Sequence, residues 1–204
     1  VKARENLLAE GVCGDRIIVT GNTVIDALME VIKRPFSFQG TPLEVVDFRK
    51  PVILMTAHRR ENWGEAMEEI CHGVKELIED NPGVQLVYPM HKNPALRRQV
   101  EPILAEHPRI HLIEPLDYLA FSHLMNASTF ILTDSGGIQE EAPALGKPVL
   151  VMRDKTERPE AIRAGTVALV GARAKGIYEK GNELLRDEKA YKSMAQAKNP
   201  YGDG

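Results

Sequence analysis

The sequence has few cysteines, no long apolar run and no excess of charge of one sign. Its two cysteines, Cys13 and Cys71, form no C-x-x-C pair, which argues against a disulfide framework and against a cysteine zinc site. The longest apolar runs are far shorter than the ~20 residues that a membrane helix needs. No signal peptide is expected, because no apolar segment follows Val1. These absences exclude a membrane protein and favour a reducing compartment, the cytoplasm.

The charge balance argues against a nucleic acid partner. The 26 Lys and Arg residues nearly match the 29 Asp and Glu residues, so the formal net charge is −3 and the positive excess of a nucleic-acid-binding protein is missing. A length of 204 residues is enough to bury a core without disulfides or metals. We therefore predict one globular domain over residues 1–204.

Short apolar segments recur along the chain and predict the strands of a parallel sheet. Seven segments have this character: Ile17–Thr20, Val52–Thr56, Val84–Tyr88, Ile110–Ile113, Phe130–Thr133, Val149–Met152 and Val167–Val170. Because they are largely apolar and show no strict alternation with polar residues, both faces of the sheet should be covered. A helix is predicted over Trp63–Ile78, with Asn62 and Glu65 as a capping pair. Another should begin at Asn93 and Pro94, and only Phe36–Lys50 is a long irregular segment.

The alternation of strands and helices predicts the fold class. It is α/β, a Rossmann-like doubly wound parallel sheet built from right-handed βαβ units. In such sheets ligands bind beyond the carboxyl ends of the strands. The loops that follow the predicted strands are therefore the candidate functional segments.

The loop after Phe130–Thr133 suits an anion. Asp134 and Ser135 are followed by two glycines and then by Ile138–Glu141, a predicted helix start whose dipole favours negative charge. The pattern is neither G-x-G-x-x-G nor a Walker A loop, which argues against a dinucleotide or P-loop site. It favours a phosphate or diphosphate, or else a tight turn that needs glycine for geometry. Glu141 could accept hydrogen bonds from ribose hydroxyls, or could be a surface acid near a helix N-terminus.

Basic and imidazole side chains follow three other predicted strands. His58, with Arg59 beside it, forms a local anion site or a solvated basic cluster, and His58 could transfer a proton near neutral pH. His91 alone is more typical of a structural histidine. Arg158 could clamp a phosphate with its planar guanidinium, although mixed charges at a helix start are usually solvated. No H-E-x-x-H, H-x-H or G-x-S-x-G pattern occurs, so we expect no metal, no cofactor and no serine triad.

Five motifs occur in a fixed order along the chain: Gly21–Ala27, Thr56–Asn62, Tyr88–Pro94, Thr133–Ala142 and Arg153–Glu160. Together they resemble the non-hydrolysing UDP-N-acetylglucosamine 2-epimerases over essentially the whole sequence. That family has the glycosyltransferase-B fold, two Rossmann-like domains with the active site between them. This sequence resembles the C-terminal domain. The resemblance implies that the N-terminal domain, the acidic residues that move the C2 proton and a final packing segment are absent from it.

The resemblance also implies roles for the site residues. The diphosphate is expected on Ser135, Gly136 and Gly137, the ribose on Glu141, and the departing UDP on Arg158. Uracil is expected against the backbone of the segment that contains Leu116 and Tyr118. His58 is expected to be the catalytic-site histidine, and Arg59 and His91 match positions that line a second, activating UDP-N-acetylglucosamine site in bacterial members.

The implied reaction converts UDP-N-acetylglucosamine to UDP-N-acetylmannosamine by elimination and re-addition of UDP, for cell-surface polysaccharide biosynthesis. The implied partners are UDP and the nucleotide sugar, with a homodimer for the full-length protein. Two alternatives stay open. One is another enzyme of this fold, a UDP-sugar glycosyltransferase or the hydrolysing epimerase, although the segment from His58 to Asn62 favours the non-hydrolysing family. The other is a stand-alone nucleotide-sugar sensor.

Overall fold

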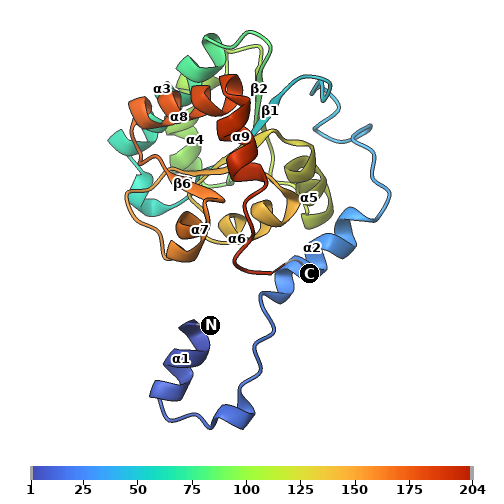
Figure 1. The fold of residues 1–204 in the computed structure, drawn as a ribbon. Helices are drawn as coiled ribbons and strands as arrows, with labels where there is room; N and C mark the ends of the chain where they lie inside the picture. Colours follow the sequence, from blue (N-terminus) through green and yellow to red (C-terminus); the bar gives the residue numbers. More distant parts are fainter. Residues whose placement is uncertain (1, 203–204) are drawn as a thin grey trace.

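The computed structural model describes residues 2–202 and contains a six-stranded parallel sheet (Figure 1). The strand order is β3-β2-β1-β4-β5-β6, and all five pairings are parallel. The strands are β1 (Val52–Thr56), β2 (Gln85–Pro89), β3 (Ile110–Ile113), β4 (Phe130–Thr133), β5 (Val149–Val151) and β6 (Val167–Leu169). This is the order of a doubly wound Rossmann-like sheet, and it confirms the predicted fold class.

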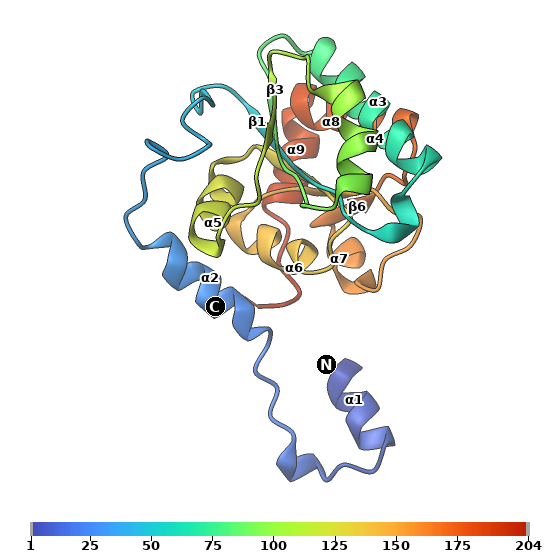
Figure 2. The same ribbon diagram turned by 180° about the vertical axis from the view of Figure 1, so that it is seen from behind.

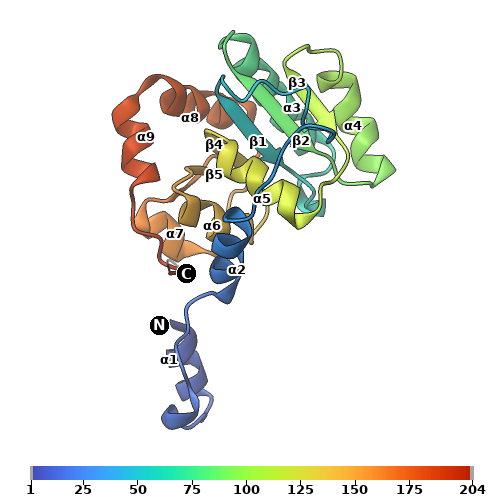
Figure 3. The same cartoon turned by 90° about the vertical axis from the view of Figure 1, so that its right-hand side faces the viewer.

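Helices cover both faces of the sheet (Figure 3). One face packs against α3 (Glu65–Glu79), α4 (Pro94–Leu104) and α8 (Ala174–Arg186). The other face packs against α2 (Thr23–Ile32), α5 (Tyr118–Ala127), α6 (Ile138–Glu141), η3 (Ala142–Leu145) and α7 (Pro159–Ala164). The chain also forms α1 (Lys2–Ala9), η1 (Gly14–Arg16), η2 (Arg60–Asn62) and α9 (Glu188–Ala195).

The central strand β1 shows why the predicted strands are largely apolar. Ile53 and Met55 point into the apolar core under α3, α4 and α8. Val52 and Leu54 point into the core on the opposite face, under α2, α5, α6 and α7, and all four residues are fully buried. Successive side chains of a strand point to opposite faces, so a strand covered on both sides needs an apolar residue at every position.

Six of the seven predicted strands form. β2 begins and ends one residue later than predicted, and β5 and β6 each end one residue earlier. The prediction at residues 17–20 is wrong. That segment is extended but lies in an arm with α1 and η1 that projects away from the sheet (Figure 2). Its Ile18 side chain is 82% exposed. A strand is stable only when a neighbour takes up its backbone hydrogen bonds, and no other strand among residues 2–202 lies beside this one.

Of the two predicted helix starts, one is confirmed. Asn93 caps α4 by accepting a hydrogen bond from the Ala95 backbone N–H at 2.9 Å. The capping pair of Asn62 and Glu65 is wrong, because α3 begins after Gly64, whose φ is +82°. Asn62 is instead buried and donates its side-chain amide to a carboxylate in the loop after β4.

The irregular segment at residues 36–50 contains no helix or strand. Two stacked ring pairs hold this segment on the face of the sheet that α5 covers. The ring centroids of Phe38 and Phe48 lie 4.1 Å apart, and those of Phe36 and His123, a residue of α5, lie 4.9 Å apart. Within residues 2–202, no helix combines the length and the apolar character needed to cross a membrane.

The sheet reverses its direction of growth between β1 and β4. Crossovers lead outward from β1 to β2 and β3 on one side, and from β4 to β5 and β6 on the other. The hydroxyls of Thr56 and Thr133 lie 2.6 Å apart where the two strands end, and both side chains are buried. The loops that follow diverge from this point, and in doubly wound sheets ligands bind in the crevice so formed.

The packing of α3 on α8 gives a stability prediction. A methyl group on Gly73 would lie 2.6 Å from the Ala174 backbone, too close without movement of a helix. We expect Gly73→Ala to lower the free energy of unfolding by about 1–3 kcal/mol, the usual cost of overpacking. The control is Gly83→Ala, because a methyl there meets nothing within 4 Å. Urea denaturation of both variants tests this, and equal midpoints would contradict the helix contact.

Candidate functional site

A cavity of about 230 Å³ lies at the carboxyl ends of β1, β2 and β4. Among its lining residues are His58, His91, Leu116, Phe121, Ser135 and Ile138. The rings of His58 and His91 face each other, with centroids 6.2 Å apart and planes 23° apart. Four residues predicted from separate loops, namely His58, His91, Leu116 and Ser135, therefore share one cavity. Leu116 and Phe121 give it an apolar wall beside the polar groups.

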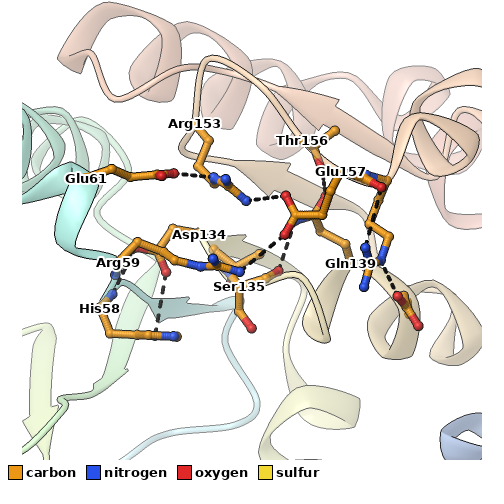
Figure 4. Close-up of polar contacts among 12 residues, drawn as sticks. His58, Arg59, Glu61, Asp134, Ser135, Gln139, Arg153, Thr156 and Glu157 are labelled. Atoms are coloured by element: carbon orange, nitrogen blue, oxygen red, sulfur yellow. Dashed lines mark hydrogen bonds and ion pairs between the residues drawn. The ribbon is translucent and has the colours of Figure 1, made fainter.

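The His58 loop is held by a carboxylate that the sequence analysis had not assigned a role. Asp134 Oδ2 accepts hydrogen bonds from the backbone N–H groups of His58 and Arg59 at 2.9 and 2.8 Å (Figure 4). It also accepts one from the Asn62 side chain at 3.1 Å. Asp134 is fully buried. The position of Asp134 directly after a buried strand is the sequence feature that could have indicated this role, because a buried carboxylate needs hydrogen-bond donors.

The glycine loop lies between two guanidinium groups. A methyl group built on Gly136 would lie 3.7 Å from Arg59 Nη2 and 3.8 Å from Arg158 Nη2. Within residues 2–202, the backbone N–H groups of Gly136 and Gly137 donate to no protein acceptor. The helix that follows, α6, has only four residues, so the expected dipole contribution is small and the N–H groups and guanidiniums carry the attraction for anions.

The carboxylate of Glu157 lies beside Gly136, between these donors. It would lie 3.2 Å from a methyl on Gly136, and it pairs with Arg59 at 3.3 Å and with Arg153 at 2.7 Å (Figure 4). A hydrogen bond from its own backbone, together with Arg153, lowers the pKa of Glu157. Arg153 in turn pairs with Glu61. An acidic side chain held here by two arginines indicates that the position suits an anionic group.

Glu141 is a second, separate acceptor next to the glycine loop. A methyl on Gly137 would lie 3.7 Å from its Oε1, and its Oε2 accepts a hydrogen bond from the Tyr118 hydroxyl at 2.8 Å. Burial raises the pKa of Glu141. Burial, and then the contact with Glu141, raise the pKa of Tyr118 to about 12. Glu141 is only 9% exposed, so the alternative that it is a solvated surface acid does not hold.

Arg158 lies at the border of the site. Its Nε pairs with Glu140, which also accepts a hydrogen bond from the side chain of Asn22. It lines a larger hollow beside Asn22 and Tyr201 instead of the His58 cavity, although its Nη2 approaches Gly136. Arg158 is thus placed beside the anion position but is held by an internal partner.

Across residues 2–202, no group of three or more His, Cys, Asp or Glu side chains gathers with the spacing of metal ligands. The polar groups of the site are donors that suit an anion together with the buried carboxylates of Asp134 and Glu141, and they sit at the switch point of the sheet. Fold and site together define a Rossmann-like α/β domain whose crevice carries hydrogen-bond donors and guanidinium groups that suit an anion.

Comparison with known proteins identifies the family. The family model described as UDP-N-acetylglucosamine 2-epimerase matches residues 1–204, and the chain belongs to this family. The UDP-N-acetylglucosamine 2-epimerase of Escherichia coli K12 is 51% identical over 208 residues, which cover 99% of this chain and 55% of that protein. The chain thus spans about half the length of the curated relatives it matches.

Solved structures agree with this assignment. The S. aureus MnaA–UDP co-structure has a TM-score of 0.90 and 48% identity, covering 99% of this chain and 55% of that one. The Neisseria meningitidis UDP-GlcNAc 2-epimerase bound to UDP-GlcNAc has a TM-score of 0.89 and 46% identity, covering 99% and 56%. The C-terminal domain of a Francisella tularensis group 1 glycosyl transferase shares the fold alone, with a TM-score of 0.60 and 16% identity over 80% and 90%.

Proposed function

We propose that this chain is the UDP-binding half of an epimerase that interconverts UDP-N-acetylglucosamine and UDP-N-acetylmannosamine. The observation that supports the proposal most strongly is that the donors around Gly136, which suit an anion, lie next to the buried carboxylate of Glu141. Arg59 and Arg158 converge on Gly136, and Glu141 Oε1 would lie 3.7 Å from a methyl group on Gly137. A diphosphate linked to a ribose has this order of charge and hydroxyl groups. The relatives solved with UDP and UDP-GlcNAc support the same ligand class.

Each part of the nucleotide has a proposed partner. The diphosphate binds Ser135 and the N–H groups of Gly136 and Gly137 after displacing the Glu157 carboxylate, with Arg158 beside it. The ribose hydroxyls donate to Glu141. The uracil lies toward Leu116 and contacts backbone groups of the segment that leads to Tyr118. The apolar wall that Leu116 shares with Phe121 supports a flat, partly apolar ring at that end.

The proposed reaction places the largest charge change on the diphosphate. A base removes the proton at C2 of the sugar, the C1–O bond breaks, and the bonding electrons leave with UDP, so that a glycal remains. UDP then adds back at C1, while a proton returns to C2 from the opposite face. Donors that are fixed before the bond breaks stabilise the leaving group most effectively. This chain supplies those donors, and His58 is its catalytic-site histidine.

We infer three further features from family resemblance. Arg59 and His91 line a second nucleotide-sugar site, and its support is that His91 faces the His58 ring across the same cavity. The longer protein is a homodimer, which sedimentation of that protein would test. The enzyme works in the cytoplasm without a nucleic acid partner, supported by the exposed free thiol of Cys13 and the net charge of −3.

The ribose assignment predicts how the domain distinguishes UDP from 2′-deoxy-UDP. A carboxylate that accepts from both ribose hydroxyls loses one charged hydrogen bond with the deoxy ligand, worth about 1.5–3 kcal/mol. We therefore expect UDP to bind about 10- to 100-fold more tightly than 2′-deoxy-UDP, since each 1.4 kcal/mol is a factor of about 10.

Calorimetric titration of both nucleotides tests this prediction. In Glu141→Gln the preference should fall to less than about threefold, because the neutral amide makes only a weaker hydrogen bond. Glu188→Gln on α9 is the control, since Glu188 is exposed and lies outside the site. A preference that survives Glu141→Gln would place the ribose elsewhere.

A further inference from the structure

The Asp134 carboxylate has one oxygen with three donors and one oxygen with none. Oδ2 accepts from His58 N, Arg59 N and Asn62 Nδ2, whereas Oδ1 is buried and has no hydrogen-bond partner in the part of the chain that the structure describes. A buried acceptor without a partner is costly, particularly on an ionised group. This unpaired oxygen points to an interaction beyond the anchoring of the loop.

The His58 imidazole is the group placed to meet this oxygen. Its Nδ1 lies 3.6 Å from Asp134 Oδ1, slightly beyond hydrogen-bond distance, and the side chain is 42% exposed on its other side (Figure 4). The backbone of His58 is itself anchored to Asp134 Oδ2, so the ring and the free oxygen cannot move far apart. A shortening of about 0.4 Å would bring the two atoms to the ~3.2 Å of an N–H···O hydrogen bond.

The charge of Asp134 also lacks a compensating partner. The three donors to Oδ2 are two backbone amides and one side-chain amide, all of them neutral. The nearby guanidinium of Arg59 pairs instead with Glu157. Within residues 2–202, no Lys or Arg forms an ion pair with Asp134, and His58 is its one potential cationic partner. Buried charges are usually paired, which makes the imidazole the natural counter-charge.

We propose that Asp134 is a positioning residue that accepts a hydrogen bond from Nδ1–H of His58 and so fixes the imidazole tautomer. The proton then sits on Nδ1, and Nε2, on the far side of the ring from Asp134, keeps a lone pair that can accept a proton. When Nε2 takes up that proton, the carboxylate faces an imidazolium. Carboxylate–histidine pairs in triad enzymes work in this way. The tautomer is independent of the proposed function, whereas its use in proton transfer rests on that function.

The Asp134→Asn variant should reverse the tautomer. The carbonyl oxygen of the new amide can still accept from the three donors that Oδ2 serves. Its NH₂ group then faces His58 Nδ1 and donates to it, which moves the ring proton to Nε2. An exchange of Asp for Asn beside a catalytic histidine in a triad has this effect on the tautomer. A residue that only anchored the loop would leave the tautomer unchanged in this variant.

The test is ¹⁵N NMR of the histidine side chains in the full chain at about pH 8, above the ordinary histidine pKa of about 6.5. His58→Gln assigns the signal, and Asp154→Asn is the control for loss of an exposed carboxylate. We expect Nδ1–H in the wild type and Nε2–H in Asp134→Asn. An Nε2–H tautomer in the wild type would overturn the proposal even if Asp134→Asn failed to fold. Failure to bind UDP would overturn the proposed function and leave this result intact.

Discussion

Replacing Gly136 by alanine should leave the domain folded and weaken UDP binding about a hundredfold. The new methyl group would enter the space between the Arg59 and Arg158 guanidiniums, where the diphosphate is proposed to lie. Its closest contact, at 3.2 Å, is the carboxylate end of the Glu157 side chain, which can move aside. Folding should therefore be nearly unaffected. Loss of one or two charged hydrogen bonds, at about 1.5–3 kcal/mol each, accounts for the expected fall in affinity.

The adjacent glycine provides the matched comparison. A methyl on Gly137 makes only an ordinary contact, 3.7 Å from Glu141 Oε1, and keeps the backbone N–H. We expect Gly137→Ala to bind UDP within about threefold of the wild type, because no hydrogen bond is lost. UDP titration and thermal unfolding of both variants measure the two effects separately. If the folded Gly136→Ala protein binds UDP with wild-type affinity, the diphosphate does not bind at this loop.

The second large effect concerns catalysis. These 204 residues alone should convert UDP-N-acetylglucosamine no faster than background. Elimination needs a base for the C2 proton as well as a stabilised leaving group. The family resemblance implies that the acidic residues that move this proton lie in the half of the relatives that this chain does not match. Fusion of the N-terminal half of the Escherichia coli relative before Val1 should produce turnover, since that relative is 51% identical over the shared part.

Product analysis by NMR checks both proteins. UDP-N-acetylmannosamine is the expected product of the fusion, whereas free N-acetylmannosamine with UDP would indicate the hydrolysing reaction. His58→Asn in the fusion is expected to reduce turnover by about 10²–10⁴-fold, the usual contribution of a general acid or base. Rapid turnover by the unfused chain would show that all the catalytic groups lie within it. That result would contradict the proposal that this chain supplies only the UDP-binding half of the active site.

The sheet and the location of the site were predictable from the sequence because both depend on local patterns. Apolar runs such as Val52–Thr56 are long enough to identify a strand buried on both faces. The rule that ligands bind beyond strand ends then selects the loops after them. That rule placed His58 and Ser135 near each other, and they do line one cavity.

Other features depend on contacts between distant residues, which the sequence pattern does not contain. Asn62 looks like a helix cap, but its amide instead bonds Asp134, 72 positions away. Ile18 and its neighbours have strand-forming side chains, yet an extended segment becomes a strand only beside another one. The position of Glu157 over Gly136 likewise depends on two arginines that approach from different loops.

The most direct test of the account is a calorimetric titration of this chain with UDP, alongside Ser135→Ala and Glu141→Ala. Ser193→Ala is the control, since Ser193 is exposed on α9. We predict saturable binding to the wild type and the control. Ser135→Ala and Glu141→Ala should each bind at least about tenfold more weakly, because each loses a hydrogen bond in which one partner is charged, the diphosphate in one case and the Glu141 carboxylate in the other. No binding by the folded wild-type chain, or binding that both substitutions leave unchanged, would contradict the account.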